Sequence, residues 1–300
     1  MLARLLRLLL VAVALGAGAI AWGLGSWLGL STGAVAVLAA ALFFAVPATM
    51  ILLTFAIAWR HRTSPPVELR IGPLAAIRCV LHEVFSYTAA YVFLQPFPRV
   101  ARWAEPGSAT GGPPPVVLVH GYMCNAGGWA WFARRLAARG HAVHAVTLEP
   151  LFVPIEDYVA PLARKLDEVV RPDERAILIG HSMGGLVCRA YARRFGGLRI
   201  ARIVTLGAPN HGSVLAPLGH GADALDMWPA SEWLRELAAS EAGGLPVPVT
   251  SIYSCHDNFV APQASSVLAG AKNVPLAGLG HLSLQFSRRV AALVAAELER

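Results

Sequence analysis

The sequence predicts an α/β fold with a mostly parallel, doubly wound sheet, preceded by two transmembrane helices. Two observations predict the sheet. After residue 113, short apolar runs typical of buried strands alternate with helical runs, and one of those strands leads directly into a glycine-flanked serine at residues 180–184. A third observation, two long apolar runs before residue 62, predicts the transmembrane pair.

Composition supports a membrane segment. The chain has 300 residues, enough for one large domain and an extension. Its hydrophobic content of 56% and mean hydropathy of +0.54 are too high for an ordinary soluble enzyme. Of the net charge of +7, residues 1–112 carry +5, because they contain eight Arg and three Glu. The basic residues accompany the hydrophobic part, which favours membrane-flanking charge and excludes a nucleic-acid surface.

The first two apolar runs cover about residues 5–24 and 34–59. Arg4 and Arg7 precede the first, Arg60 and Arg62 follow the second, and the connecting loop is uncharged. Each run is long enough to cross a bilayer. The positive-inside rule then predicts that residues 1–62 form a hairpin in the inner (cell) membrane, with both ends and the globular domain in the cytoplasm. A signal peptide cleaved near residues 17–21 and a buried hairpin of a soluble protein are the alternatives.

Residues 63–112 connect the hairpin to the globular domain. Between residues 67 and 95, Leu74, Ile77 and Leu81 recur at helical spacing. This helix either lies on the bilayer surface or packs under the globular domain, and the sequence does not decide between them. Residues 105–115 are rich in Pro and Gly, as expected of a linker, so the globular domain is expected to cover residues 113–300.

The globular domain is expected to alternate strands and helices. The expected strands are Val116–Val119, 141–148, the apolar run ending at Gly180, Ile200–Leu206, 247–254 and about 274–276. The expected helices are 129–139, 155–170, 186–195 and an amphipathic helix at 285–298. An insertion at about 213–246, with a short helix at 231–240, interrupts this alternation. It is either a lid above the strand ends or a plain connection.

Gly180-His181-Ser182-Met183-Gly184 fits the G-x-S-x-G nucleophile elbow. A serine on a tight strand-to-helix turn is held in a strained conformation, with its hydroxyl raised above the sheet edge. Side chains at the two glycine positions would collide with the neighbouring strand and helix. Ser182 is therefore the expected nucleophile.

A serine nucleophile needs a general base and a carboxylate that orients the base, and an elbow serine is followed by the acid and then the histidine. Asp257 follows a strand and His281 comes 24 residues later, so both satisfy the order. None of the competing acids Asp223, Asp226 and Glu241 follows a strand. Of the competing histidines, His211 precedes Asp257, and His256 is adjacent to it and would point the other way.

The oxyanion hole needs two backbone N–H groups aimed at the developing charge. The expected donors are Met183, directly after the nucleophile, and Tyr122, in the loop after the first strand. His120 is expected to anchor that loop by hydrogen bonds. Of the four cysteines, Cys188 and Cys255 read as small buried hydrophobes, with a disulfide between them left open. No metal-ligand spacing occurs, so neither a metal nor a cofactor is expected.

These motifs resemble the α/β-hydrolase superfamily, and more closely its bacterial triacylglycerol lipase and esterase branch. The resemblance covers about residues 113–300 and rests on residues 119–122, 180–185, 205–213 and 228–237, and on Asp257 and residues 280–282. It implies the same triad of Ser182, Asp257 and His281. Secreted members often bind calcium through an aspartate just after the catalytic histidine, whereas here residues 282–284 are Leu-Ser-Leu, so a calcium requirement is not expected.

The combined expectation is a membrane-anchored serine esterase or lipase that cleaves acyl or lipid esters through an acyl-enzyme. The bilayer and an acyl-ester substrate are the expected partners. An acyltransferase, thioesterase or amidase could use the same triad, since acceptor choice depends on pocket shape and water access. A non-catalytic membrane scaffold is the remaining alternative, which the complete triad disfavours.

Overall fold

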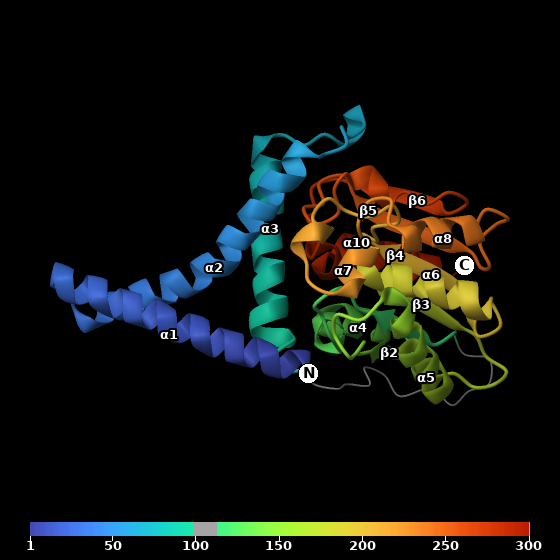
Figure 1. Cartoon of the computed structure of the whole chain (residues 1–300), viewed down its shortest axis with the longest axis horizontal. Coiled ribbons are helices and arrows are strands. Elements are labelled where there is room, and N and C mark those ends of the chain that lie inside the picture. The colour runs from blue at the N-terminus through green and yellow to red at the C-terminus, as the bar shows by residue number, and fades with distance from the viewer. Residues whose placement is uncertain (99–112, 300) are drawn as a thin grey trace.

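A computed structural model describes residues 1–98 and 113–299. Figure 1 shows an α/β domain on one side and the N-terminal helices α1–α3 on the other. Most of the predicted Pro/Gly linker, and the domain boundary at residue 112, lie outside the described residues.

The α/β domain contains a six-stranded sheet in the order β2-β1-β3-β4-β5-β6, and every neighbouring pair is parallel. The predicted doubly wound α/β fold is confirmed. The strands are β1 (Val116–Val119), β2 (Val143–Val146), β3 (Ala176–His181), β4 (Ile200–Leu206), β5 (Val249–Ser254) and β6 (Lys272–Leu276). The chain moves from β1 to β2 and then returns to β3 on the other side of β1. The strand order therefore reverses beside β1, where open α/β sheets bind their ligands.

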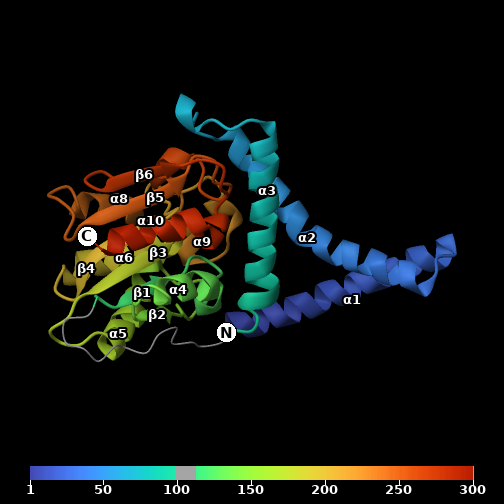
Figure 2. The same cartoon turned by 180° about the vertical axis from the view of Figure 1, so that it is seen from behind.

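Helices cover both faces of the sheet (Figures 1 and 2). On one face, α5 (Val159–Val169), α6 (Met183–Phe195) and α8 (Glu232–Ser240) pack against strand residues such as Val117 and Val119. On the other, α4 (Ala130–Ala137) and α10 (Arg288–Leu298) pack against residues such as Val116 and Leu118. Because side chains alternate along a strand, a strand covered on both faces needs the continuous apolar run seen in β1.

The sequence predicted one amphipathic helix at residues 285–298, but the structure has two helices there. The prediction was therefore wrong for the first residues of this range. A short helix, α9 (Ser283–Phe286), ends before Ser287, and α10 begins after it. Ser287 has an extended backbone and its hydroxyl accepts a hydrogen bond from the Val290 N–H. Serine favours this capping position because its short side chain satisfies an unpaired helix N–H. The break directs α9 toward the site described below.

The two apolar runs form α1 (Leu2–Leu28) and α2 (Thr32–Arg60), which project away from the α/β domain as a hairpin (Figure 1). Gly29 closes α1 in a left-handed conformation with φ 65°. Both helices are long and apolar enough to cross a membrane, with window hydropathies of 2.1 and 2.5. Only 17% and 11% of those windows are buried. A core helix of a soluble protein would be mostly covered.

Helix α3 (Pro73–Thr88), which continues as a π-helix, η2 (Ala89–Leu94), lies between the hairpin and the α/β domain (Figures 1 and 2). Cys79, Glu83 and Ser86 on one face are buried. The opposite face exposes four large apolar side chains, Leu74, Ile77, Leu81 and Phe85. The helix therefore packs against the domain, as one of the two sequence alternatives proposed, and still presents an apolar surface on its outer side.

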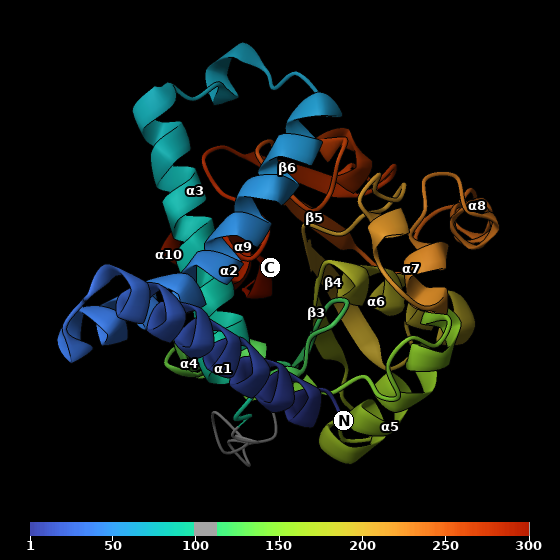
Figure 3. The same ribbon diagram turned by 60° about the vertical axis from the view of Figure 1, so that its left-hand side comes forward.

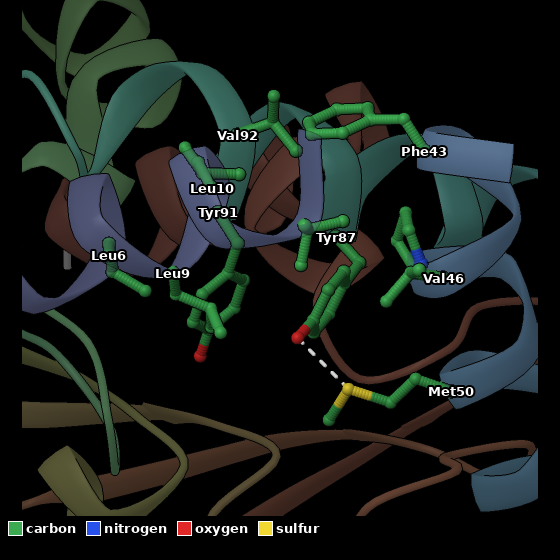
Figure 4. A pocket seen from close by; sticks show the side chains of 11 residues that line it. Leu6, Leu9, Leu10, Phe43, Val46, Met50, Tyr87, Tyr91 and Val92 are labelled. Carbon is green, nitrogen blue, oxygen red and sulfur yellow. Dashed lines mark hydrogen bonds between the residues drawn. The ribbon is translucent and has the colours of Figure 1, made fainter. Parts of the chain in front are cut away.

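An apolar cavity of about 90 Å³ lies between α1, α2 and the α3–η2 segment (Figure 4). Its lining includes Leu6, Leu9 and Val13 of α1, Phe43 and Met50 of α2, and Tyr87 and Tyr91. The Tyr87 hydroxyl donates to the Met50 sulfur at 3.0 Å. Two lining residues, Leu6 and Tyr91, belong to the same apolar cluster as Met123 and Phe152 of the α/β domain. The cavity thus lies one layer of side chains away from the loop that follows β1.

Candidate active site

The turn between β3 and α6 holds Ser182 at φ 55° and ψ −129°, a region that non-glycine residues rarely occupy. A Cβ at Gly180 would lie 2.5 Å from the Gly184 carbonyl oxygen, and one at Gly184 would lie 2.3 Å from the Val119 oxygen. Both approaches are impossible for a residue with a side chain. The turn therefore has the geometry and the glycine requirement that the motif predicts.

The loop after β1 lies directly against the serine. A Cβ at Gly121 would be 2.8 Å from the Ser182 Cβ and 3.4 Å from its Oγ. Tyr122, one of the two expected oxyanion donors, is the next residue. The other, Met183, is the first residue of α6, where a backbone N–H has no acceptor within its own helix. The structure thus brings both predicted donors beside the predicted nucleophile.

His120 holds this loop in place, as the sequence suggested. The Leu148 N–H donates to His120 Nε2 at 2.8 Å, so the imidazole proton is on Nδ1, which donates to the Gly121 carbonyl at 2.9 Å. Burial lowers the pKa of His120 to about 4. The ring is therefore neutral at physiological pH and suited to anchoring the loop.

Asp257 and His281 form a buried pair at the ends of β5 and β6. His281 Nδ1 lies 2.8 Å from Asp257 Oδ2, and the two residues are 4% and 2% exposed. The other carboxylate oxygen, Oδ1, accepts from the backbone N–H groups of Phe259 and Val260, each at 2.8 Å. Asp257 is thus fixed by its own loop, and its contact with Nδ1 leaves Nε2 of His281 to act as a base.

His181 links the elbow to the histidine loop. Its Nε2 lies 3.1 Å from the His281 carbonyl oxygen, and the two ring centroids are 4.5 Å apart. Burial and the nearby charge of His281 hold the pKa of His181 well below its usual value, so the ring is neutral and its Nε2–H donates. Because His181 immediately precedes Ser182, this contact sets the loop that carries His281 against the elbow.

The charge balance around His281 favours its protonated form. Burial by itself lowers the pKa of His281, but the charge of Asp257, its hydrogen bond and the charge of Glu83 together hold the pKa above the usual value. A general base in this environment gains from both carboxylates when it takes up a proton.

The competing acids have other partners. Asp223 accepts from the Tyr158 hydroxyl at 3.1 Å, Asp226 accepts from the Ile155 N–H at 2.7 Å, and Glu241 is bound to the buried Arg189. Among the competing histidines, His256 Nδ1 faces the Gly278 N–H at 3.3 Å.

The insertion contacts the loop after β1. The Tyr122 hydroxyl donates to the His220 carbonyl at 2.7 Å and accepts from the His220 N–H at 2.8 Å. This pair of bonds joins the loop after β1 to the insertion predicted at residues 213–246.

Two polar side chains that sequence reasoning did not assign to the site contact the histidine loop, and a third contacts one of these two. Asn258 Oδ1 accepts from the His281 N–H at 3.0 Å, and Asn258 Nδ2 donates to Thr54 Oγ1 of α2 at 2.8 Å. Glu83 of α3 accepts from the next two backbone N–H groups of that loop. The one available signal was the presence of a single acid, Glu83, within an otherwise apolar helix face.

All four cysteines lie in the described part of the chain and are unpaired there. The disulfide between Cys188 and Cys255 that the sequence left open is absent. Cys188 is buried in the core on α6, as a small hydrophobe is expected to be.

A family model described as "Alpha/beta hydrolase family" matches residues 116–248. Among curated proteins, Methylesterase 7 of Arabidopsis thaliana is 36% identical over 103 residues, which are 31% of this chain and 38% of that protein. Salicylic acid-binding protein 2 of Nicotiana tabacum is 40% identical over 81 residues, covering 23% of this chain and 30% of that protein. The chain therefore matches these relatives over about a third of their length.

Two solved structures are similar in fold. The mature form of the Bacillus licheniformis lipase BlEst2 superposes with a TM-score of 0.57 at 18% identity, covering 65% of this chain and 96% of that one. A bromoperoxidase from Bacillus anthracis has a TM-score of 0.50 at 15% identity, covering 63% and 93%. At such low identity the similarity concerns the fold of the α/β domain.

Proposed function

Because the globular domain of this chain is an α/β-hydrolase, we propose that the protein is a membrane-anchored serine hydrolase that cleaves carboxylic esters through an acyl-enzyme. The observation that carries the proposal is the buried Asp257–His281 pair, whose loop contacts the residue before Ser182 on its strained turn. The methylesterase names of the matched plant relatives favour ester hydrolysis within this fold.

The reaction follows from the roles of these groups. His281 Nε2 takes the Ser182 hydroxyl proton as Oγ attacks the ester carbonyl carbon, and Asp257 stabilises the resulting imidazolium. The N–H groups of Tyr122 and Met183 hold the negative oxygen of the tetrahedral intermediate. His281 then gives its proton to the departing alkoxide, which leaves as an alcohol. A water molecule repeats the sequence on the acyl-enzyme, releasing the acid and restoring Ser182.

The membrane part of the proposal rests on the N-terminal helices. The α1–α2 hairpin would cross the bilayer and the exposed apolar face of α3 would lie at its surface. Contacts of Leu6, Thr54 and Glu83 with the α/β domain place these helices on the side where the β strands end. The catalytic domain would then face the membrane from the cytoplasmic side, as the basic residues beside the hairpin favour.

A lipid or other long-chain acyl ester suits this arrangement. The cavity between α1, α2 and the α3–η2 segment is lined by apolar and tyrosine side chains, and its inner residues pack against Met123, next to the oxyanion donor Tyr122. An acyl chain is the part of an ester substrate that gains from such a surface. In this proposal residues 1–62 are the membrane hairpin, residues 63–112 the juxtamembrane helix and linker, and residues 113–300 the catalytic domain, with the insertion at 213–246 as its lid.

The direct test compares wild-type protein with Ser182→Ala on p-nitrophenyl esters of short and medium acyl chains. Loss of essentially all hydrolysis is expected, since no other group would form the acyl-enzyme. Ser240→Ala, an exposed serine on α8, serves as the matched control and should retain full activity. Equal rates for wild type and Ser182→Ala would refute the proposed nucleophile.

A further inference from the structure

Glu83 is a fully buried carboxylate that the mechanism above does not use. It belongs to α3, outside the α/β domain, and is 0% exposed. Its Oε1 accepts from the Leu282 N–H and its Oε2 from the Ser283 N–H, each at 2.8 Å. These are the two residues directly after the base His281. A buried carboxylate is costly unless its oxygens are paired, and here each oxygen has a backbone partner.

The loop is shaped around this carboxylate. A Cβ at Gly280 would lie 2.4 Å from Glu83 Oε2, so the residue before the base must lack a side chain for the backbone to come this close. The Ser283 hydroxyl donates to the Gly280 carbonyl at 3.0 Å and closes the loop on itself. The backbone on both sides of His281 is thus in contact with Glu83.

Three consecutive backbone N–H groups of the histidine loop are held by side chains. Asn258 accepts from His281, and Glu83 accepts from Leu282 and Ser283. Asn258 is in turn bound to Thr54 of α2. Both supports therefore reach back to the N-terminal helices, across about 200 residues of sequence.

We propose that Glu83 is a positioning residue of the hydrolase: it fixes the loop that carries His281, and its negative charge stabilises the imidazolium that forms during the reaction. This inference rests on the proposed function, in which His281 is the base. It makes α3 a part of the active site in addition to a connection to the membrane.

A carboxylate suits this position better than its amide. Two N–H donors need two acceptor oxygens, whereas glutamine offers one oxygen and turns an NH₂ group toward the second donor. The charge also matters, since His281 lies close enough for Glu83 to raise its pKa. A glutamine would remove this effect while keeping almost the same shape.

The titratable groups that face Glu83 are Cys79 on its own helix and His281 and Asp257 on the catalytic loops. Burial raises the pKa of Glu83 to about 7, against the lowering effect of the two N–H groups and of His281. Above this pH Glu83 is ionised and supports the protonated base. As the pH falls through 7, Glu83 takes up a proton, its support of the imidazolium is lost, and one carboxyl oxygen becomes a donor.

The test measures kcat and KM for p-nitrophenyl butyrate with the full-length protein in detergent micelles, from about pH 5 to about pH 9. Glu83→Gln should lower kcat by roughly 10- to 100-fold with little change in KM, because the base is misplaced while the substrate surface is intact. The acidic limb of kcat/KM should move to lower pH, because His281 loses the charge that raises its pKa. Glu83→Asp keeps the charge and should keep the wild-type limb with an intermediate kcat.

Glu68→Gln is the matched control, since it makes the same change at an exposed position of the same N-terminal region, and it should behave as wild type. A folded Glu83→Gln protein with an unchanged acidic limb would overturn the inference, even if its melting temperature fell. If Glu83→Gln does not fold, Glu83→Asp provides the test instead. A shift in the acidic limb of its kcat/KM profile would then overturn the inference. Failure of wild type to hydrolyse any ester through Ser182 would instead refute the proposed function.

Discussion

At the scale of single residues, backbone space decides which side chains the site tolerates. The glycines around Ser182 are not interchangeable with alanine, because the strand β1 and the loop after it approach the elbow within contact distance. Each of these three glycines leaves room for a different neighbour. Gly180 makes room for the start of α6, Gly184 for the Val119 carbonyl and Gly121 for Ser182. The strain at Ser182 persists because these contacts leave the serine no relaxed alternative.

Gly184→Ala should therefore disrupt the elbow. Its Cβ would meet the Val119 carbonyl oxygen at 2.3 Å, and the rigid strand β1 has no room to move away. We expect a loss of roughly 1–3 kcal/mol in the free energy of unfolding, together with slow labelling of Ser182 by a fluorophosphonate probe. Gly243→Ala, where a Cβ meets nothing within 4 Å, is the control. Wild-type labelling and melting temperature in Gly184→Ala would contradict this reading of the turn.

At the scale of secondary structure elements, α1 and α2 both extend from the α/β domain and pack against it. Their inner ends pack on it through Leu2, Leu6 and Ala58, while their outer parts remain largely exposed. The cavity lies where the inner end of α1 and the middle of α2 meet the α3–η2 segment (Figure 4). Substrate contact in this region would depend on acyl-chain length, whereas the chemistry at Ser182 would not.

Val13→Trp tests this point, because Val13 lines the cavity. The larger ring should fill the cavity and lower kcat/KM for long-chain p-nitrophenyl esters about 10-fold, the effect of losing burial of a few methylenes, with short-chain hydrolysis unchanged. Val11→Trp introduces the same ring on an exposed face of α1, 57% exposed and outside the cavity. A uniform loss for all chain lengths, or the same effect in both variants, would exclude the cavity as the acyl-chain site.

The sequence predicted most of these elements for local reasons, and local patterns also underlie the proposed triad. Buried parallel strands appear as continuous apolar runs, the elbow is a five-residue motif, and Asp257 and His281 each follow a strand. The break at Ser287 was missed because the helical spacing of apolar residues continues across this serine. Glu83 and Asn258 were missed because their partners depend on tertiary packing between segments about 200 residues apart, which no local pattern records.

At the scale of the whole molecule, the proposed bilayer and the active site lie on the same side of the α/β domain. The strand ends that carry Ser182, Asp257 and His281 face α2 and α3, and the hairpin extends beyond them (Figures 1 and 3). A substrate embedded in the membrane would then reach the site without crossing much water, in keeping with the apolar surfaces on this side.

Orientation in the membrane is testable with reporter fusions placed after Arg62 and after Arg300. Both should report a cytoplasmic position, since Arg4, Arg7, Arg60 and Arg62 flank the hairpin on its open end and its closed end carries no charge. A fusion within the turn at Gly29 should give the opposite signal. A periplasmic position for the first two fusions would reverse the proposed topology.

The contacts of Glu83 with the histidine loop and of Thr54 with Asn258 also bear on where in the cell the proposed hydrolase could work. A catalytic domain released from its N-terminal helices would keep Ser182, Asp257 and His281 but lose the acceptors for two N–H groups and the partner of Asn258. Such a freely diffusing form would have a loosened base and turn over slowly. Under the proposed function, this dependence would confine ester hydrolysis to the form that keeps its N-terminal helices, and a released domain would leave esters in the surrounding solution intact.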